Sequence, residues 1–324
     1  MIRRFLFSAA ALVVVMALAV PGATARPAAS GRSASGYAFW KSRGYLVSNP
    51  TKFWQAKARA AARAGQKVTP QAVSPNDPVA SPAFEGVFES DLAPPDTTGA
   101  VGDSSFVEAI NLQLALYDRT GGLKSTVPME GLFGGAHFNY SDPQALWDPH
   151  TRRFYLLIWD TTNATMRWAF SKTHDPATLT AADWCTYTSS FGYSPNDAPD
   201  YPKLGQTTDF LVIGVNFFQN FATFMGGETL TIQKPQVGPG PVPVCPPNTF
   251  MTHRFTETRF IGALHSNAPE PAQQADPSSL GYVVAVPDAF TANVIASVSP
   301  ASGEARPRLF ITSLRSSCNC CFGE

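Results

Sequence analysis

The chain carries little charge and no excess of either sign. Only 15% of its 324 residues are charged, and 24 Lys and Arg balance 24 Asp and Glu. A nucleic-acid-binding domain needs a basic patch or stripe that can neutralise phosphates. We therefore predict no nucleic-acid partner, and we expect a monomer.

Recognisable catalytic patterns are also missing. The sequence contains no Gly-x-Ser-x-Gly nucleophile elbow and no His-Glu-x-x-His zinc motif. The Asp box of sialidase-like propellers, Ser-x-Asp-x-Gly-x-Thr-Trp, does not occur either. We identify no catalytic residue, and the question of enzymatic activity stays open, with a non-catalytic protein favoured.

Cysteines are few, and two of them lie in the region expected to be globular. Cys185 and Cys245 could form a disulfide in an oxidising compartment, where such bonds persist. On a chain-entropy argument the closed loop would stabilise the fold by about 3–4 kcal/mol. The alternative is two unpaired thiols, because the sequence cannot place the two sulfur atoms together.

Proline is abundant, at 28 residues, and is accompanied by 24 glycines and 12% aromatic residues. The usual share of proline is about 5%. Such a composition favours many short strands joined by turns, so we predict an all-β fold.

The N-terminus has the pattern of a signal peptide over residues 1–25. Arg3 and Arg4 precede an apolar run at residues 5–20, and residues 23–25 read Ala-Thr-Ala, a small-x-small cleavage site. A membrane anchor is the alternative, but the apolar run is shorter than the roughly 20 residues of a span. We predict export to the cell surface or medium, with no membrane span after signal removal.

Residues 26–95 form the expected lead-in, a proline-rich linker with a short helix. The stretch Phe53–Ala64 is rich in alanine and arginine, which are strong helix formers, and Gly65 follows it. Its apolar face is mostly alanine, so we expect a weakly packed surface helix and no membrane helix.

A motif that recurs three times indicates the architecture. Each copy has an aspartate, a short turn, a second aspartate and a strand that opens on phenylalanine, and the copies begin at Asp96, Asp142 and Asp200. Their starts lie about 46 and 58 residues apart, the range of propeller blades and solenoid repeats. Residues 143–189 are expected to hold four strands, the content of one blade. We therefore predict β-propeller blades over residues 96–316, with about four blades visible.

The repeat-leading aspartates Asp96, Asp142 and Asp200 are the candidate channel residues. Blades arranged about one axis bring equivalent positions into a ring. Three carboxylates there could hold Ca²⁺, which takes about six to eight oxygen ligands. The alternative, which we favour, is that each aspartate caps its own turn through hydrogen bonds to backbone amides. We therefore expect no cofactor and no metal, with Ca²⁺ as the alternative.

Aromatic residues are dense throughout the repeats, and most are expected to pack between blades. The apolar stretch from Phe217 to Phe224 is the exception, because it is expected to be a long loop between strands. Exposed aromatic rows can bind sugars by stacking, so this segment is a candidate ligand-binding loop.

The C-terminal residues 317–324 form an atypical tail with Cys318, Cys320 and Cys321. These cysteines are closer together than the ligands of a zinc site, so we predict no metal there. The chain ends just after an expected strand, and closed propellers have ~4–8 complete blades. We therefore expect a truncation or a change of reading frame, with an exposed strand edge that favours aggregation.

Several sequence blocks together resemble one group of proteins. Residues 94–102 read PPDTTGAVG, residues 117–122 read YDRTGG, residues 141–148 read SDPQALWD and residues 199–205 read PDYPKLG. These blocks are similar to those of exported bacterial β-propeller-like proteins of sialidase-superfamily type. The resemblance covers about residues 90–220. It implies a secreted or cell-surface propeller that is longer at its C-terminus, without a settled activity or known catalytic residues.

Three functional hypotheses remain open. The first is an extracellular binding or adhesion module for a glycan or protein ligand, which we favour because no catalytic set is identifiable. The second is a carbohydrate-active hydrolase or lyase that uses channel carboxylates such as Asp142 or Glu108. The third is a truncated fragment without function.

Overall fold

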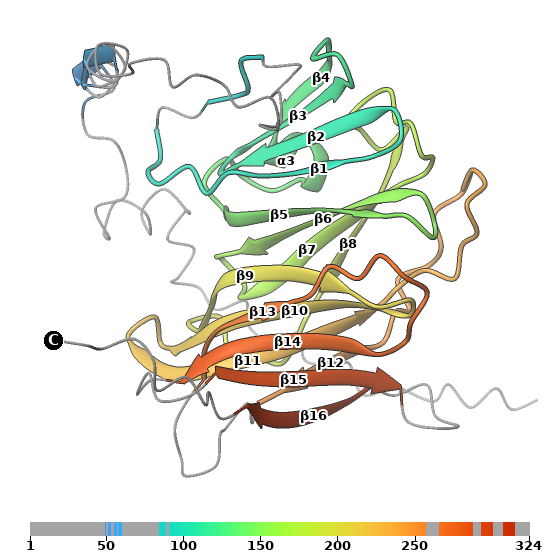
Figure 1. Cartoon of the computed structure of the whole chain (residues 1–324). Helices are drawn as coiled ribbons and strands as arrows, with labels where there is room; N and C mark the ends of the chain where they lie inside the picture. The colour runs from blue at the N-terminus through green and yellow to red at the C-terminus, as the bar shows by residue number, and fades with distance from the viewer. Residues whose placement is uncertain are drawn as a thin grey trace, which may run out of the picture. The chain divides into compact units, whose positions relative to one another are not determined.

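The computed structural model describes residues 84–88, 91–256, 266–287, 293–300 and 307–314, together with a few residues between 49 and 59. Strands β1 to β16 dominate this part of the chain (Figure 1). The all-β prediction is confirmed. In the same residues, no helix has the length and apolar character needed to cross a membrane.

The strands form four antiparallel sheets, each made of four strands that are consecutive in the sequence. The first sheet contains β1 (Thr98–Val101), β2 (Ser105–Ile110), β3 (Gln113–Asp118) and β4 (Leu123–Pro128). The second contains β5 (Tyr140–Asp148), β6 (Arg153–Asp160), β7 (Thr165–Ser171) and β8 (Trp184–Ser189). The third contains β9 (Ala198–Gln206), β10 (Phe210–Gln219), β11 (Thr223–Gln233) and β12 (Thr252–Phe255). The fourth contains β13 (Ser266–Pro271), β14 (Gly281–Pro287), β15 (Asn293–Pro300) and β16 (Pro307–Leu314).

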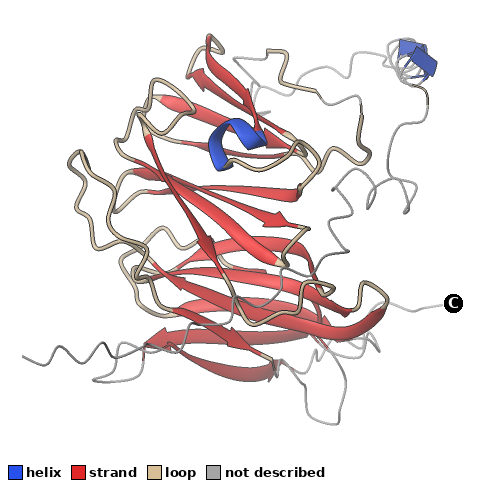
Figure 2. Ribbon diagram, turned by 180° about the vertical axis from the view of Figure 1, so that it is seen from behind, coloured by secondary structure: helices blue, strands red, loops and turns tan. Residues whose placement is uncertain are grey.

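Two details differ from the sequence prediction. The motif predicts short turns after Asp96 and Asp200, but strands β1 and β9 occupy these segments and pair with β2 and β10. A short helix, α3 (Met129–Phe133), also lies beside the first sheet (Figure 2). Its five residues are too few to show a helical periodicity in the sequence, whereas its buried Met129 and Phe133 explain why it forms against the core.

Some predictions fall on residues that the structure does not describe. The signal peptide (1–25), much of the lead-in (26–95) and the Cys-rich tail (317–324) lie outside the described residues. Of the expected helix over residues 53–64, residues 55, 56, 58 and 59 are described, and they are helical.

Consecutive sheets pack face to face, and the first strand of each lies beside the first strand of the next. β1 contacts β5, β5 contacts β9, and β9 contacts β13. The sheets pack in this way because their strands have apolar side chains on both faces, as β6 shows most clearly. This strand is buried along its whole length. Its Phe154, Leu156 and Ile158 belong to the core shared with the first sheet, whereas Leu157 and Trp159 belong to the core shared with the third. Alternate side chains of a strand point to opposite faces, so an uninterrupted apolar run is needed here.

The packing between the third and fourth sheets depends on a glycine. Gly214, in β10, lies directly against the backbone of Pro269 in β13, and a β-carbon there would overlap the Pro269 carbonyl oxygen. Phe210 and Val212 of β10 then contact Val283 of β14. The absence of a side chain at position 214 thus sets how closely these two sheets approach.

A buried ion pair joins the second and third sheets. Nζ of Lys234, just after β11, lies 2.6 Å from Oδ2 of Asp148, at the end of β5. Lys234 also donates hydrogen bonds to the backbone oxygen of Thr207 (3.1 Å) and to Oε1 of Gln206 (3.3 Å). Burial lowers the pKa of Lys234, and its ammonium group offsets the cost of burying Asp148, whose pKa lies below its ordinary value.

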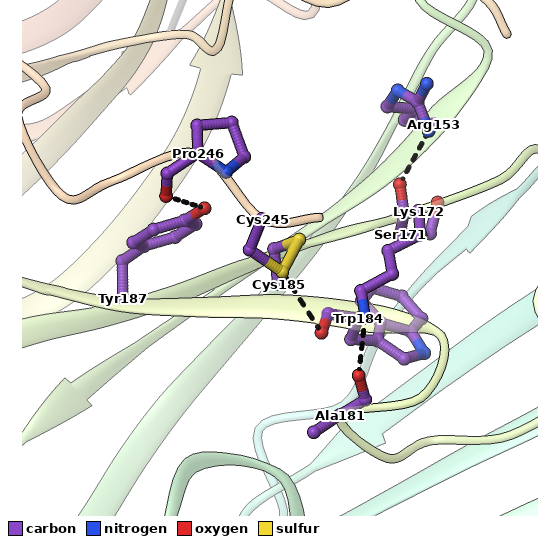
Figure 3. Close-up of a disulfide and its surroundings, with 9 residues drawn as sticks. All are labelled: Arg153, Ser171, Lys172, Ala181, Trp184, Cys185, Tyr187, Cys245 and Pro246. Carbon is purple, nitrogen blue, oxygen red and sulfur yellow. Dashed lines mark hydrogen bonds between the residues drawn. A yellow bond between two sulfur atoms is a disulfide. The ribbon is translucent and has the colours of Figure 1, made fainter. Parts of the chain in front are cut away.

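The long segment between β11 and β12 reaches back to the second sheet, where a disulfide fixes it (Figure 3). Cys185 of β8 is bonded to Cys245, and the two Cα atoms are 5.5 Å apart. Next to this bond, Oη of Tyr187 donates a hydrogen bond to the backbone oxygen of Pro246 (2.9 Å). The predicted Cys185–Cys245 disulfide is confirmed, and it ties a segment of the third sheet to the edge of the second.

We expect the Cys185→Ser, Cys245→Ser double variant to unfold at a lower temperature and denaturant concentration than the wild type. The disulfide closes a loop across 60 positions, and removing such a link costs about 3–4 kcal/mol of unfolding free energy on a chain-entropy argument. Tyr187→Phe is the matched control, because it removes only the neighbouring hydrogen bond and should cost about 1 kcal/mol. Equal stability of the wild type and the double variant in urea titrations would contradict the expectation.

Candidate functional site

A cavity of about 420 Å³ lies where the second and third sheets meet the segment that precedes β1. The start of β5, the end of β6, the start of β9 and the turn between β10 and β11 contribute to its walls. Its acidic and amide side chains are those of Asp96, Asn111, Asp142 and Asp200. The volume falls in the range of roughly 300–1,000 Å³ that is typical of small-molecule sites.

All three aspartates singled out from the sequence line this one cavity. The hydrogen bonds of two of them run to other segments of the chain instead of their own turns. Oδ2 of Asp96 accepts a hydrogen bond from Nδ2 of Asn111 (2.5 Å). Oδ2 of Asp142 accepts one from the backbone N–H of Tyr201, in the next sheet (3.2 Å). The carboxyl groups therefore connect sheets in addition to lining the cavity.

The turn-capping pattern that we expected at these positions occurs at other aspartates. Oδ1 of Asp118 accepts the backbone N–H groups of Thr120 (2.7 Å) and Gly122 (2.9 Å). Oδ1 of Asp160 likewise accepts the N–H of Thr162 (3.1 Å). Both aspartates end a strand, where the chain reverses and leaves backbone amides without ladder partners.

Asn111 organises the polar side of the cavity. Besides its bond to Asp96, its Nδ2 donates to the backbone oxygen of Pro94 (3.0 Å), and its Oδ1 accepts the backbone N–H of Asp142 (2.8 Å). Asn111 itself is 2% exposed, and these three bonds are partly buried. Sequence reasoning missed this role, because an asparagine at the end of a strand looks like an ordinary turn residue.

The three copies of the motif are not equivalent in the structure. The backbone has a positive φ at Asp96 (46°), Asp142 (55°) and Tyr201 (54°), and the pairing of β5 and β9 shifts register at this point. Tyr201 therefore occupies the place of the first two aspartates, and Asp200 lies one residue earlier. Matching Asp200 with Asp142 in the repeated motif is therefore wrong by one position. In both strands the bulge lies at a positive-φ residue that is followed by a proline, Asp142 before Pro143 and Tyr201 before Pro202.

Asp142 has a strongly perturbed pKa. Burial raises the pKa of its carboxyl group well above the ordinary value, and the negative charges of Asp200 and Asp96 raise it further. A hydrogen bond with Asp96 also favours the protonated form, whereas the backbone amide of Tyr201 opposes the shift. Asp142 thus retains its proton to a higher pH than an ordinary carboxyl group does, and in that state it can donate a hydrogen bond.

Aromatic rings form the apolar part of the wall. The ring centroids of Trp159 and Phe221 are 6.3 Å apart, and Phe218 lies beside them in the lining. Tyr201 is 46% exposed, and Nζ of Lys203 lies 3.6 Å from the centroid of its ring. Aromatic faces of this kind can stack on a ligand ring or attract a cation.

Phe221 is held toward the cavity by an unusual turn. Asn220 and Phe221 have φ values of 52° and 57°, and the N–H of Ala222 donates to the backbone oxygen of Gln219 (3.1 Å). Positive φ at both central residues is the pattern of type I′ hairpin turns, which prefer asparagine and glycine. A phenylalanine there is uncommon. The predicted aromatic loop of residues 217–224 is thus a tight hairpin that brings two of its rings to the cavity.

Glu108, the other carboxylate considered from the sequence, is not part of the cavity lining. It lies in β2, where its Oε2 accepts the backbone N–H of Val87 (3.0 Å) and the hydroxyl of Tyr117 (3.1 Å). Its neighbours Val107 and Ala109 belong to the core shared with the second sheet, so Glu108 points to the opposite face of the first sheet. This position corrects the hypothesis that Glu108 is a channel carboxylate. It therefore serves as a control position for the cavity.

Comparison with known proteins does not assign the chain to a family. No protein-family model matches the chain, and a search of curated proteins finds no significant relative. Among the described residues, no three or more histidine, cysteine, aspartate or glutamate side chains group as metal ligands do. The geometry of the cavity is therefore the basis for any functional proposal.

We expect Asp142→Asn to be more stable than the wild type at neutral pH. The pKa of Asp142 is higher in the folded protein than in the unfolded chain, where it is about 3.9. The folded state thus binds more protons between these two pKa values, and stability falls as the pH rises through this window. The amide variant does not titrate, so its advantage in urea titrations should shrink toward about pH 4.

Asp175→Asn is the control of opposite sign. Hydrogen bonds from Lys124 and Ser105 lower the pKa of Asp175 to about 2, so its charged form stabilises the folded state above about pH 4. This variant should be less stable than the wild type at neutral pH. A loss of stability for both variants at neutral pH would contradict the assignment of Asp142 as a group that favours its proton.

Proposed function

We propose that this protein is an exported β-propeller module that binds an extracellular glycan in the cavity at Asp142. The observation that carries the proposal is the meeting of carboxyl groups and aromatic rings from separate sheets in one cavity of about 420 Å³. Sugars present hydroxyl groups at their edges and apolar C–H faces, so they need both kinds of partner. Few, well-placed polar groups in a largely apolar pocket are typical of small-molecule sites.

The architecture supports the propeller part of the proposal. The four-stranded antiparallel sheets follow one another in sequence and pack face to face, with each first strand beside the next first strand. Blades of a propeller are likewise four-stranded antiparallel sheets that repeat about a central channel, so this packing supports the proposal. The disulfide between Cys185 and Cys245 supports export, because such bonds persist in oxidising compartments.

We expect Phe221→Gly to fold and to lose affinity for the glycan. Glycine suits the positive φ of this turn position, whereas loss of the ring removes an apolar contact that should weaken binding by about tenfold. The measurement is a glycan array with the purified wild type, followed by calorimetric titration of the best ligand. Phe88→Ala is the control, since Phe88 is 64% exposed and lies outside the cavity. No glycan binding by the wild type, or unchanged affinity of Phe221→Gly, would count against the proposal.

A carbohydrate-active hydrolase or lyase is the second candidate function. One observation favours it, the raised pKa of Asp142 beside Asp96 and Asp200. A carboxyl group that keeps its proton can act as a general acid, and a neighbouring ionised carboxylate can act as base or nucleophile. Environments that separate the pKa values of paired carboxyl groups are typical of such enzymes.

For this second function we expect the wild type to release reducing sugar from a polysaccharide and Asp142→Asn to lose about 10²–10⁴-fold of that rate. Glu108→Gln should retain the activity, because Glu108 lies outside the cavity. Sugar release that survives the Asp142 substitution would exclude this residue as the acid, and no release from any tested polysaccharide would leave the binding module as the better proposal.

A further inference from the structure

We propose that the ligand of this cavity carries a positive charge, as an amino sugar or another organic ammonium compound does, and that its ammonium group lies among Asp96, Asp142 and Asp200. This inference rests on the proposed function, because it names the chemical class that the same cavity would bind. It is based on the charge of the lining, the aromatic walls and the volume.

The charge of the lining is one-sided. Three carboxyl groups line the cavity, and no lysine, arginine or histidine is among the described residues that line it. Like charges brought together away from bulk water repel one another, at a cost that a cation between them removes.

The aromatic walls are a second and independent feature that suits an ammonium group. Nζ of Lys203 lies 3.6 Å from the centroid of the Tyr201 ring, so this ring face is already covered by a cation of the protein itself. Trp159, Phe218 and Phe221 supply further ring faces on the same cavity. Rings and carboxylates together are the usual recognition elements for organic cations.

The volume and the wall chemistry favour an organic cation over a metal ion. Ca²⁺ is coordinated by oxygen atoms at about 2.3–2.6 Å and gains nothing from aromatic faces. Among the residues that the structure describes, the acidic side chains do not form a metal-type group of three. A cavity of about 420 Å³ instead leaves room for the body of a small organic molecule behind its charged group.

Binding of a cation should release a proton. In the empty cavity the pKa of Asp142 is raised by burial, by Asp200 and by Asp96. The backbone N–H of Tyr201 donates to the Asp142 carboxyl group, and the neutral amide of Asn111 accepts the backbone N–H of Asp142. The nearby cation Lys203 lies against the Tyr201 ring. A bound ammonium group would favour the ionised carboxylate, so affinity should rise with pH through the titration of Asp142.

The test uses pairs of ligands that differ in charge and not in shape. Choline has a permanent positive charge, and 3,3-dimethylbutan-1-ol is the uncharged compound in which carbon replaces its nitrogen. Glucosamine and glucose form the corresponding sugar pair. We expect calorimetric titration of the purified protein to show at least about tenfold tighter binding of the charged member of each pair.

Two variants locate the charge. Asp142→Asn and Asp200→Asn should each weaken choline binding by about tenfold, whereas Glu108→Gln should leave it unchanged. With choline, whose charge does not titrate, affinity should rise with pH for the wild type and stay constant for Asp142→Asn. Proton release, measured from the dependence of the binding heat on buffer ionisation, should likewise disappear in Asp142→Asn. Circular dichroism confirms that each variant is folded before its titration is interpreted.

The outcomes separate this inference from the proposed function. Equal affinities within each pair overturn the inference and leave the cavity as a site for neutral sugars. Stoichiometric Ca²⁺ binding without choline binding assigns the carboxylates to a metal and overturns it as well. No binding by any of the four compounds, together with a blank glycan array, overturns both the inference and the proposed function.

Discussion

The face-to-face packing of consecutive four-stranded sheets is the constraint on which the rest of the structure depends. A single sheet of this kind cannot bury both of its apolar faces, and the second sheet shows the consequence. Its strand β6 is buried along its length, with alternate residues in the cores shared with the first and third sheets. The first strand of each sheet then lies beside the first strand of the following sheet. Segments that are far apart in the sequence therefore meet at one end of the sheets.

The cavity is a product of this convergence, and its polar side is costly to assemble. Three carboxyl groups from three separate segments are brought together in it, and the fold accommodates them by two means. Asn111 supplies an amide that bonds to Asp96 and to the backbone of Asp142, and Asp142 keeps its proton where an ordinary carboxyl group would lose it. A protonated carboxyl group of this kind can donate a hydrogen bond, and a nearby positive charge would favour its ionised form.

The second and third sheets supply most of the cavity, and an ion pair and a disulfide also link them. The Lys234–Asp148 ion pair joins them at the end of β5, whereas the cavity lies at the start of the same strand. The Cys185–Cys245 disulfide joins them again at the β8 edge. These links limit the relative movement of the two sheets. A ligand site between walls that are held in this way would lose less entropy on binding than a site between free walls.

The sequence by itself determined the strand-rich class and the positions of most strands in the second sheet, because these depend on local alternation and turn residues. It made a Cys185–Cys245 disulfide a candidate, and the tertiary structure decided that the two sulfur atoms meet. The sequence also singled out Asp96, Asp142 and Asp200, since a repeated motif places its members at related positions. Only the tertiary structure decided that Tyr201, and not Asp200, is the equivalent of Asp142, that Asn111 connects the carboxyl groups, and that Glu108 lies on another face of the first sheet. The physical reason is that a bulge of one residue, or the choice of sheet face, leaves local sequence patterns unchanged while it moves a side chain from one environment to another.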